Sequence, residues 1–216
     1  MDYTKKRILK VTIELFSEKG PEKVTMRDIA SKCNISLGNL TYYFNRKEDI
    51  FAAAFEELIQ REYNHYLQYY TDSDENPWIS FIAVNYAHLK AATCSDTAIS
   101  SYIYATNFPS SRESYVQVSS NLLYRCLENT PYTQDRESVW LASLIGCGGE
   151  FEAINAYRSL KGRYDLDELI IPTFSVRMFL LDCEKNEISR LIKEGIKKGN
   201  SIYPELYNSG LFGNND

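Results

Sequence analysis

The sequence predicts an all-α protein with a small N-terminal helix-turn-helix head, a long connecting helix and a larger helical body. Apolar residues recur three or four positions apart along most of the 216-residue chain, which places them on one face of each predicted helix. Proline, glycine and asparagine separate these segments, as is typical of helix ends and turns. No stretch of any length shows the apolar–polar alternation of a half-buried strand.

The first helix occupies the N-terminal segment and ends at Lys19. Its apolar stripe has the i, i+3, i+4, i+7, i+8 spacing of an amphipathic helix and consists of Ile8, Val11, Thr12, Leu15 and Phe16. Gly20 and Pro21 follow. Glycine commonly ends a helix and proline cannot continue one, so these two residues predict the stop.

Residues 25–44 predict a second helix, a tight turn and a very short third helix. Thr25 is a favourable N-cap, and Asp28 suits the first turn of the second helix. Asn34 tolerates a positive φ in the turn, and Ser36 can then cap the third helix. This order of elements is the helix-turn-helix plan, in which the second helix of the pair enters the major groove of DNA.

A long fourth helix is expected over residues 47–70, after a turn around residues 45–47. At 1.5 Å per residue it is about 36 Å long, which is enough to connect a small head to a larger body. The polar segment 71–77 forms a loop. Further helices are predicted at about 77–94, 96–106, 110–129, 135–160, 167–184 and 186–198.

These elements divide the chain into three parts. Residues 1–46 form the helix-turn-helix domain, residues 47–199 form the helical body and residues 200–216 form a C-terminal tail. The tail is rich in Asn, Gly and Ser, yet it includes large apolar side chains. These are Tyr203, Tyr207, Leu211 and Phe212. The sequence leaves open whether the tail docks on the body or frays.

Charge is distributed unevenly along the chain. The net charge is -5, which by itself argues against a general nucleic-acid binder. Residues 1–50, however, hold ten Lys and Arg against seven Asp and Glu, a net charge of +3, and the remaining residues carry a net charge of -8. This distribution indicates that only the N-terminal end of the molecule meets a polyanion.

Several other classes of protein are disfavoured. No apolar run approaches the roughly 18 residues that cross a bilayer, and no signal peptide is present. The five cysteines show no CxxC spacing, so we expect reduced thiols in a cytoplasmic protein rather than disulfides or a zinc site. Two histidines and no phosphate-binding or nucleophile motif predict no metal, no cofactor and no enzymatic activity.

The third helix is predicted to have an inward and an outward face. The inward set packs against the first helix and consists of Ile29, Ala30, Ile35, Leu40 and Phe44. The outward set is left for DNA and consists of Ser36, Gly38, Asn39, Thr41, Tyr42 and Tyr43. Gly38 lets the backbone approach DNA closely. Asn39 can pair with adenine and Thr41 can offer a methyl group to thymine, whereas the tyrosine hydroxyls can reach phosphates.

Three more residues complete the predicted DNA-contact set. Thr25 can offer its hydroxyl and amide to a phosphate at an exposed helix N-terminus, and Arg27 and Lys47 add positive charge. In an arbitrary helix, a Tyr-Tyr-Phe run is more often part of a core. Here Phe44 is enough to anchor the helix, glycine and asparagine are poor packing residues, and the basic surplus lies in the same segment, so DNA contact is favoured.

Three short stretches of the head carry a pattern of residue types and spacings: TMRDIA at 25–30, ISLGNLTYYF at 35–44 and KEDI at 47–50. This pattern resembles the TetR family of bacterial transcriptional regulators. The resemblance covers about residues 4–55, a quarter of the chain, and is specific because spacing and residue type agree throughout.

Three positions depart from the family pattern. Cys33 stands where alanine is usual, Asn34 where glycine is usual and Thr41 where tyrosine is common. The first two are tolerable in a turn. Tyr42, Tyr43 and Lys47 match the pattern and take over its DNA-contact role. Any contact made by the tyrosine that Thr41 replaces is lost or changed.

The resemblance also implies what the body does. In this family the C-terminal body is a regulatory and dimerisation domain, forms a homodimer through its last two long helices and often encloses a pocket for a small inducer. Here those helices correspond to about 135–160 and 167–184. The chain is therefore expected to be a repressor that leaves a palindromic double-stranded DNA operator when the inducer binds.

The middle helices supply aromatic side chains for a hydrophobic or aromatic inducer. The candidate residues are Tyr86, Tyr102, Tyr104, Phe108, Tyr115, Trp140 and Glu150. Most such aromatic residues are simply core, and Glu150 is more readily a surface carboxylate than a buried acid. The run Gly146–Gly149 either permits close helix approach, at a dimer seam or beside a pocket, or marks a break in the helix. Pro172 marks a first helical turn or a kink.

Two other functions stay open on the sequence alone. A protein of the same fold could lack an inducer and use its body to recruit a protein partner, which a body without a cavity or with a large exposed apolar patch would favour. An all-α enzyme with a vestigial head is the other alternative. DNA binding that weakens steeply with salt would separate a regulator from that enzyme.

Overall fold

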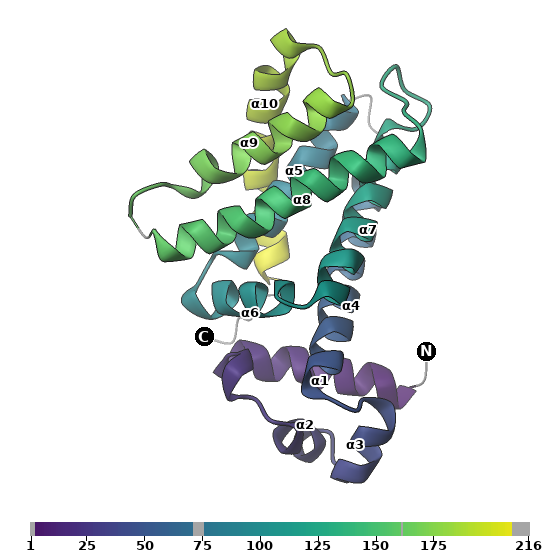
Figure 1. Ribbon diagram of the computed structural model, residues 1–216, viewed down its shortest axis with the longest axis vertical. Helices are drawn as coiled ribbons and strands as arrows, with labels where there is room; N and C mark the ends of the chain where they lie inside the picture. Colours follow the sequence, from purple (N-terminus) through teal and green to yellow (C-terminus); the bar gives the residue numbers. More distant parts are fainter. Residues whose placement is uncertain (1–2, 71–75, 161, 209–216) are drawn as a thin grey trace.

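The computed structural model describes residues 3–70, 76–160 and 162–208, with the backbone alone for 65–70 and 205–208. These residues form ten α-helices, one short 3-10 helix and no strand, so the all-α prediction is confirmed. Figure 1 shows a small head of α1, α2 and α3 below a larger body of α5 to α10. The long helix α4 runs from one to the other.

The head contains α1 (Tyr3–Lys19), the 3-10 helix η1 (Pro21–Lys23), α2 (Met26–Lys32) and α3 (Leu37–Tyr43). Its core also includes the start of α4 (Lys47–Tyr70). The buried side chains come from all four α-helices and include Ile8, Leu15, Ile29, Leu40 and Ile50. The apolar spacing read from the sequence therefore assembles a separate hydrophobic core under the helix-turn-helix.

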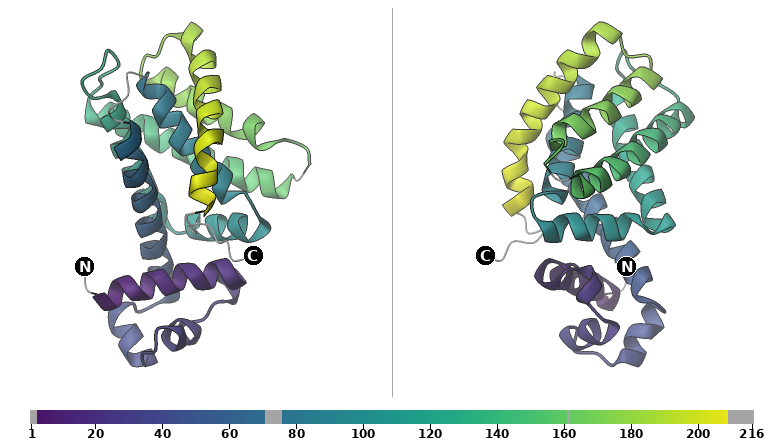
Figure 2. Two further views of the ribbon diagram at one scale, coloured as in Figure 1. Left: turned by 180° about the vertical axis from the view of Figure 1, so that it is seen from behind. Right: turned by 60° about the vertical axis from the view of Figure 1, so that its left-hand side comes forward.

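The body contains α5 (Pro77–Ala92), α6 (Asp96–Thr106), α7 (Pro109–Leu127), α8 (Arg136–Ser159), α9 (Leu166–Leu180) and α10 (Lys185–Asn208). Helix α5 is buried on all sides at the centre. Helix α10 packs along it, as the views in Figure 2 agree. Two glycines of α10 permit this contact: a Cβ atom at Gly195 would lie 2.6 Å from Ile82, and one at Gly199 would lie 2.8 Å from the Ala83 carbonyl.

The predicted end of the last helix, residue 198, is wrong. Helix α10 continues to Asn208 and contains Pro204. Ile202 is buried and Tyr203 packs against the body core, so tertiary packing outweighs the weak helix propensity of this Asn- and Ser-containing segment. Tyr207 has a described backbone only, and Leu211 and Phe212 lie outside the described residues.

The glycine run of α8 does not break the helix, which is continuous from Arg136 to Ser159. A Cβ atom at Gly146 would lie 2.4 Å from the Arg177 side chain, and one at Gly149 would lie 3.0 Å from Thr173. Both glycines therefore let α8 approach α9 within one protomer, whereas a Cβ at Gly148 would meet open space. Pro172 lies in the second turn of α9 and not in its first.

Candidate nucleic-acid interface and buried polar centre

A capping box sets the start of α2. Asp28 N–H donates to the Thr25 hydroxyl oxygen at 3.2 Å, and the Thr25 amide and hydroxyl donate to Asp28 Oδ2 at 2.9 and 2.7 Å. These hydrogen bonds lower the pKa of the Asp28 carboxyl, so it stays ionised and accepts both of them. The two donors that Thr25 was expected to offer to a phosphate are therefore already used within the protein, whereas Arg27 is exposed beside them.

The turn between α2 and α3 has the conformation that Asn34 predicts. Its φ is 52°, in the left-handed region that asparagine tolerates better than most residues. The Ile35 amide donates to the Ala30 carbonyl at 3.0 Å, which closes the end of α2. Cys33 is buried under the turn, so the residue that departs from the family pattern is part of the head core.

Hydrogen bonds also orient the exposed side of α3. The Ser36 hydroxyl accepts from the Asn39 amide at 3.1 Å, and the Thr41 hydroxyl donates to the Gly38 carbonyl at 3.0 Å. Gly38 and Asn39 are exposed, and Tyr42 is 83% exposed. Tyr43 is half-buried and lies edge-on to Tyr42, with ring centroids 5.3 Å apart.

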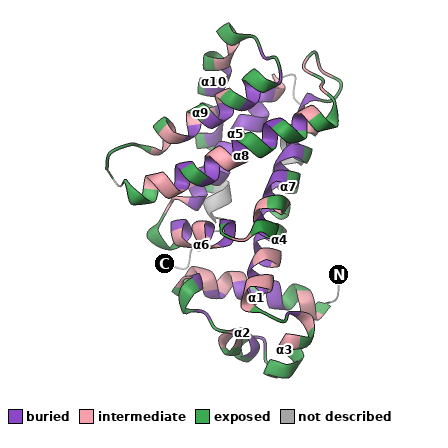
Figure 3. Ribbon diagram, in the orientation of Figure 1, coloured by how far each residue is buried: buried purple, intermediate pink, exposed green. Residues whose placement is uncertain are grey.

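The opposite side of α3 holds it to the head. Leu40 and Phe44 are buried, as are Ile29 and Ala30 of α2, and Ile35 is partly buried against the same cluster. The inward residues therefore lie where periodicity places them, and Gly38, Asn39 and Tyr42 of the outward set are exposed, whereas Tyr43 packs partly against the head core. In Figure 3, α3 projects from the lower end of the molecule, away from the body. No other part of the described chain covers its outer face in that view.

The Lys47 side chain makes contacts within the protein, whereas the sequence predicts that it contacts a phosphate of DNA. Its ammonium donates to the Pro21 carbonyl at 3.0 Å and lies over the rings of Phe51 and Tyr104, 5.2 and 5.5 Å from their centroids. In this conformation Lys47 is bound between the head and α6 of the body. The expected phosphate contact therefore requires its side chain to move.

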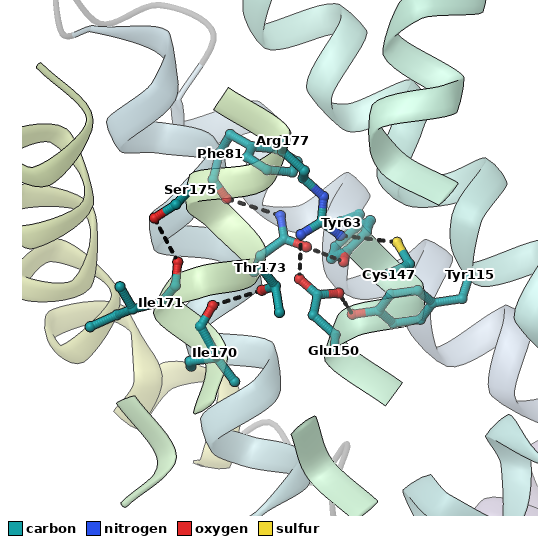
Figure 4. A network of polar contacts seen from close by, with 11 residues as sticks. Tyr63, Phe81, Tyr115, Cys147, Glu150, Ile170, Ile171, Thr173, Ser175 and Arg177 are labelled. Atoms are coloured by element: carbon teal, nitrogen blue, oxygen red, sulfur yellow. Dashed lines mark hydrogen bonds and ion pairs between the residues drawn. The ribbon is translucent and has the colours of Figure 1, made fainter. Parts of the chain in front are cut away.

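The body encloses a polar centre around Arg177 of α9 (Figure 4). Arg177 Nη1 donates to Glu150 Oε1 at 2.7 Å, Nη2 lies 3.1 Å from Cys147 Sγ, and the Tyr115 hydroxyl donates to Glu150 Oε2 at 3.3 Å. Arg177, Glu150 and Tyr115 are each 0% exposed. Burial opposes the charge of Arg177, but Glu150 and Cys147 outweigh it and raise the pKa of the guanidinium.

This arrangement corrects the expectation that Glu150 is a surface carboxylate. Its burial is possible because Gly146 leaves room for the Arg177 side chain, which supplies the opposite charge. Removing one partner of such a pair leaves an uncompensated buried charge and costs about 3–5 kcal/mol. The glycine run and Glu150 thus serve one buried ion pair.

A second buried pair joins α4 to α5. His88 Nδ1 lies 2.6 Å from Glu62 Oε2, and both residues are almost completely buried. Burial raises the pKa of the Glu62 carboxyl, although His88 acts in the opposite direction. The ring of His88 also packs against Tyr102 and Tyr115, with centroids 5.9 and 5.5 Å away. The two buried pairs are therefore linked by a cluster of aromatic rings.

A small apolar cavity of about 60 Å³ lies between α1, α4 and α6. Its walls include Phe16 of α1, Phe51 and Phe55 of α4 and Ala98 of α6. Tyr102 also lines this cavity, while its ring contacts His88 and Tyr115 of the buried centre. Tyr102 thus separates the cavity from the polar centre.

The seven predicted ligand residues do not all lie at one site in the structure. Tyr102, Tyr115 and Glu150 come together in the centre of the body. Tyr104 and Phe108 instead form a pair near the head, with centroids 5.2 Å apart. Tyr86 faces Gly199 of α10, and Trp140 is 39% exposed on α8. These contacts place Tyr86 against α10 and Trp140 at the surface of α8.

Sequence reasoning missed four polar members of the centre: Glu62, Tyr63, His88 and Arg177. Tyr63 donates to Asn85 Oδ1 at 2.8 Å. A signal was present for two of them, since Arg177 interrupts the apolar sequence of α9 and His88 lies in the apolar helix α5. A lone polar residue on an apolar helix predicts a buried partner, but the sequence does not identify that partner.

Helices α8 and α9 carry a set of exposed apolar side chains, and both helices have exposed segments in Figure 3. We call this set the α8/α9 face; it consists of Trp140, Leu141, Leu144, Ile145, Val176, Phe179 and Leu180. Gly148 lies on the same side of α8, where an added Cβ would meet open space. Exposed apolar patches of this kind mark interaction surfaces.

None of the helices in the described part of the chain is long and apolar enough to cross a membrane.

The chain shares sequence similarity with known regulators in its head. The family model for bacterial regulatory proteins of the TetR family matches residues 8–54. The uncharacterized HTH-type transcriptional regulator YerO of Bacillus subtilis is 39% identical over 64 residues, or 30% of this chain and 22% of that protein. An uncharacterized HTH-type regulator from the dhlA 5′ region of Xanthobacter autotrophicus is 36% identical over 55 residues, or 26% and 27% of the two chains. The match thus spans about a quarter of the length of each of these relatives.

Similarity of fold extends over the body. The structure of RolR without ligand has a TM-score of 0.68 at 16% identity, covering 87% of this chain and 96% of RolR. A TetR transcriptional regulator from Rhodococcus sp. RHA1 has a TM-score of 0.62 at 20% identity, covering 83% and 96%. The head of this chain thus matches the model of the TetR family of bacterial regulatory proteins, and the chain as a whole has the fold of the solved TetR transcriptional regulator from Rhodococcus.

Proposed function

We propose that the protein is a TetR-type transcriptional regulator that binds a near-palindromic DNA operator as a homodimer and acts as a repressor. The observation that carries this proposal is α3. One side of this helix is locked into the head by Leu40 and Phe44, while Gly38, Asn39 and Tyr42 face outward. A helix presented in this way fits the major groove, where Asn39 can read a base and Tyr42 can contact a phosphate. Operator DNA of this kind lies in the bacterial cytoplasm, where we place the protein.

The α8/α9 face supports the proposed homodimer. It spans two adjacent helices and exposes Phe179 by 67% and Ile145 by 52%. Burying large apolar side chains stabilises association by roughly 25 cal/mol per Å² of area. The outward-facing Gly148 lets a second α8 approach closely. A two-fold dimer would then present two heads to successive major grooves.

The polar centre supports a small aromatic inducer that carries hydroxyl groups. Tyr102, Tyr115 and Phe151 provide ring surfaces, and Glu150 and Glu62 provide acceptors. RolR, which has this fold, has been solved in complex with resorcinol. The apolar cavity lies on the other side of Tyr102, next to this centre. Helix α6 packs on both α1 and α8 and so connects this centre to the head.

Selection of bound DNA from a random pool tests the regulator. A palindromic sequence should be enriched, and its affinity should fall steeply between 50 and 200 mM salt because several Lys and Arg contacts release counterions. Exchange of the exposed Glu152 on α8 for Gln serves as a control that leaves operator binding unchanged. Failure to enrich any sequence, or binding insensitive to salt, would reject the proposal.

The inducer is tested separately with a panel of phenols and dihydroxybenzenes. A member of the panel should raise the melting temperature of the protein and release the operator, and Tyr115→Phe should weaken both effects. Operator affinity that stays constant across a broad panel would favour the alternative in which the body recruits a protein. The α8/α9 face would then hold that partner, and the protein alone would sediment as a monomer at micromolar concentration.

A further inference from the structure

Lys47 is the first residue of α4 and is held by three different elements. Its ammonium donates to the Pro21 carbonyl of η1 at 3.0 Å. It also lies over Phe51 of its own helix and over Tyr104 of α6, 5.2 and 5.5 Å from the ring centroids. Both ring distances are within the range of a cation–π attraction. The first residue of the connecting helix is therefore in direct contact with both the head and the body.

The rings around Lys47 form a continuous row across the joint between head and body. Phe16 of α1 stacks on Phe51 with centroids 3.8 Å apart and planes 12° apart. Phe51 contacts Tyr104 at 4.7 Å, and Tyr104 contacts Phe108 at 5.2 Å. Burial raises the pKa of the Tyr104 hydroxyl, and Glu48 and Glu22 add to the shift. The ring therefore stays neutral at physiological pH.

The Lys47 ammonium can lie either at the Pro21 carbonyl and the two rings or at a DNA phosphate, but not at both. In the family pattern this lysine matches a residue with a DNA-contact role, and its position beside the helix-turn-helix allows its flexible side chain to reach a phosphate. A charge that lies between two rings and a carbonyl must leave them to do so. The contacts with Pro21, Phe51 and Tyr104 thus oppose DNA binding by an amount that depends on where α6 places Tyr104.

We propose that Tyr104 is a positioning residue that restrains Lys47 and thereby sets the affinity of the head for DNA. The inference rests on the proposed function, in which Lys47 contacts a phosphate of the operator. Tyr102 and Tyr104 lie on the same helix, the first beside the buried centre and the second beside Lys47. A ligand that holds α6 in the position described here keeps Lys47 away from the phosphate and weakens operator binding.

Operator titrations with single and double variants test the restraint. Tyr104→Leu removes the aromatic face, so operator affinity should rise about three- to tenfold, the range of a partly exposed cation–π contact. Tyr104→Phe keeps the face and is the matched control, with wild-type affinity. Lys47→Gln should reduce the slope of log affinity against log salt by about 0.9, as expected for one lost phosphate contact.

The coupling between the two positions distinguishes this role from general packing. In a Lys47→Gln background, Tyr104→Leu should no longer raise the affinity, because the restrained charge is absent. A gain that persists without Lys47 would overturn the proposal, as would a salt slope unchanged by Lys47→Gln. Thermal unfolding of each variant confirms that it is folded.

A measurement without DNA separates this inference from the proposed function. Reductive methylation followed by mass spectrometry reports the access of each lysine ammonium. Lys47 should react more slowly than the exposed Lys10 and Lys193, and Tyr104→Leu should bring its rate closer to theirs. Equal rates in the wild-type protein would overturn the restraint, even if the operator is bound as proposed. Slow methylation without any DNA binding would instead reject the proposed function alone.

Discussion

Asn39 and Tyr42 both face outward from α3, but they differ in what they can read. An amide pairs with one base edge, so Asn39→Ala should relax the preference at a single base pair by roughly 1–3 kcal/mol. Tyr42 is 83% exposed and its hydroxyl is expected to contact a backbone phosphate, so Tyr42→Phe should weaken binding to all sequences modestly. Titration of both variants against operators mutated one position at a time separates a loss of preference at one base pair from a uniform loss of affinity. Unchanged binding and preference in both variants would show that α3 faces DNA differently.

Glu62 gives the stability of the body a dependence on pH. Burial raises the pKa of this carboxyl above its ordinary value of about 4.3, so the folded protein holds the proton more tightly than the unfolded chain. The stability that this proton provides is complete below the unfolded pKa and is lost as pH rises through the folded pKa.

The isosteric change Glu62→Gln tests this dependence because it fixes a neutral group at the same place. Thermal unfolding between pH 4.5 and 8 should show a smaller loss of stability with rising pH than the wild-type protein shows. Glu137→Gln, at an exposed position of α8, is the matched control and should follow the wild-type curve. An identical pH profile for Glu62→Gln and wild type would contradict the raised pKa.

Individual residues show where sequence reasoning reaches its limit. The faces of α3 follow from periodicity because Leu40 and Phe44 can only be buried on one side of a short helix. The burial of Glu150 could not be predicted, since it depends on Arg177, which is 27 residues away and on another helix. Lys47 could not be placed either, because its partners belong to η1 and α6. Contacts between distant segments leave no periodic signal.

At the scale of the helices, glycines decide which pairs approach closely. A Cβ atom at Gly199 would lie 2.8 Å from both the Ala83 carbonyl and the Tyr86 ring, whereas one at Gly148 would meet nothing within 4 Å. Alanine favours a helix over glycine by about 1 kcal/mol. Gly199→Ala should therefore destabilise the protein because α10 has to move away from α5, while Gly148→Ala should not destabilise the protomer.

Urea unfolding of the two variants measures this contrast within one protein. We expect Gly199→Ala to lower the free energy of unfolding by about 1–3 kcal/mol, the usual range for overpacking. Equal effects of the two changes would show that α10 does not pack as closely on α5 as described. The same contact explains the length of α10: its docking on α5, and not local propensity, carries the helix past residue 198 to Asn208.

At the scale of the whole molecule, the N-terminal quarter and the rest of the chain have net charges of opposite sign. The basic surplus of residues 1–50 and the length of α4 are visible in the sequence, so the division into head and body could be predicted. The joint between them could not, because it consists of rings from α1, α4 and α6. Those rings give the body a physical connection to the helix-turn-helix.

In the proposed homodimer, the contact between the protomers determines how strongly the two heads act together. Binding of the second head to its half-site becomes intramolecular once the first is bound, which raises the overall affinity by about two orders of magnitude or more. Phe179→Glu places a charge on the α8/α9 face, where the wild-type side chain is 67% exposed. This variant should sediment as a monomer and lose most of its affinity for the full operator, while its affinity for a single half-site stays unchanged.

A charge change away from that face provides the control. Lys197→Glu lies at an exposed position of α10 and should leave the dimer intact. The wild-type protein and the two variants are compared by sedimentation velocity and by titration with full and half operators. The salt concentration is the same throughout, because the effect of a changed charge on DNA affinity depends on screening. If Phe179→Glu remains dimeric, the two protomers meet elsewhere. If it becomes monomeric yet binds the full operator like wild type, the heads bind independently and the palindromic operator loses its physical basis.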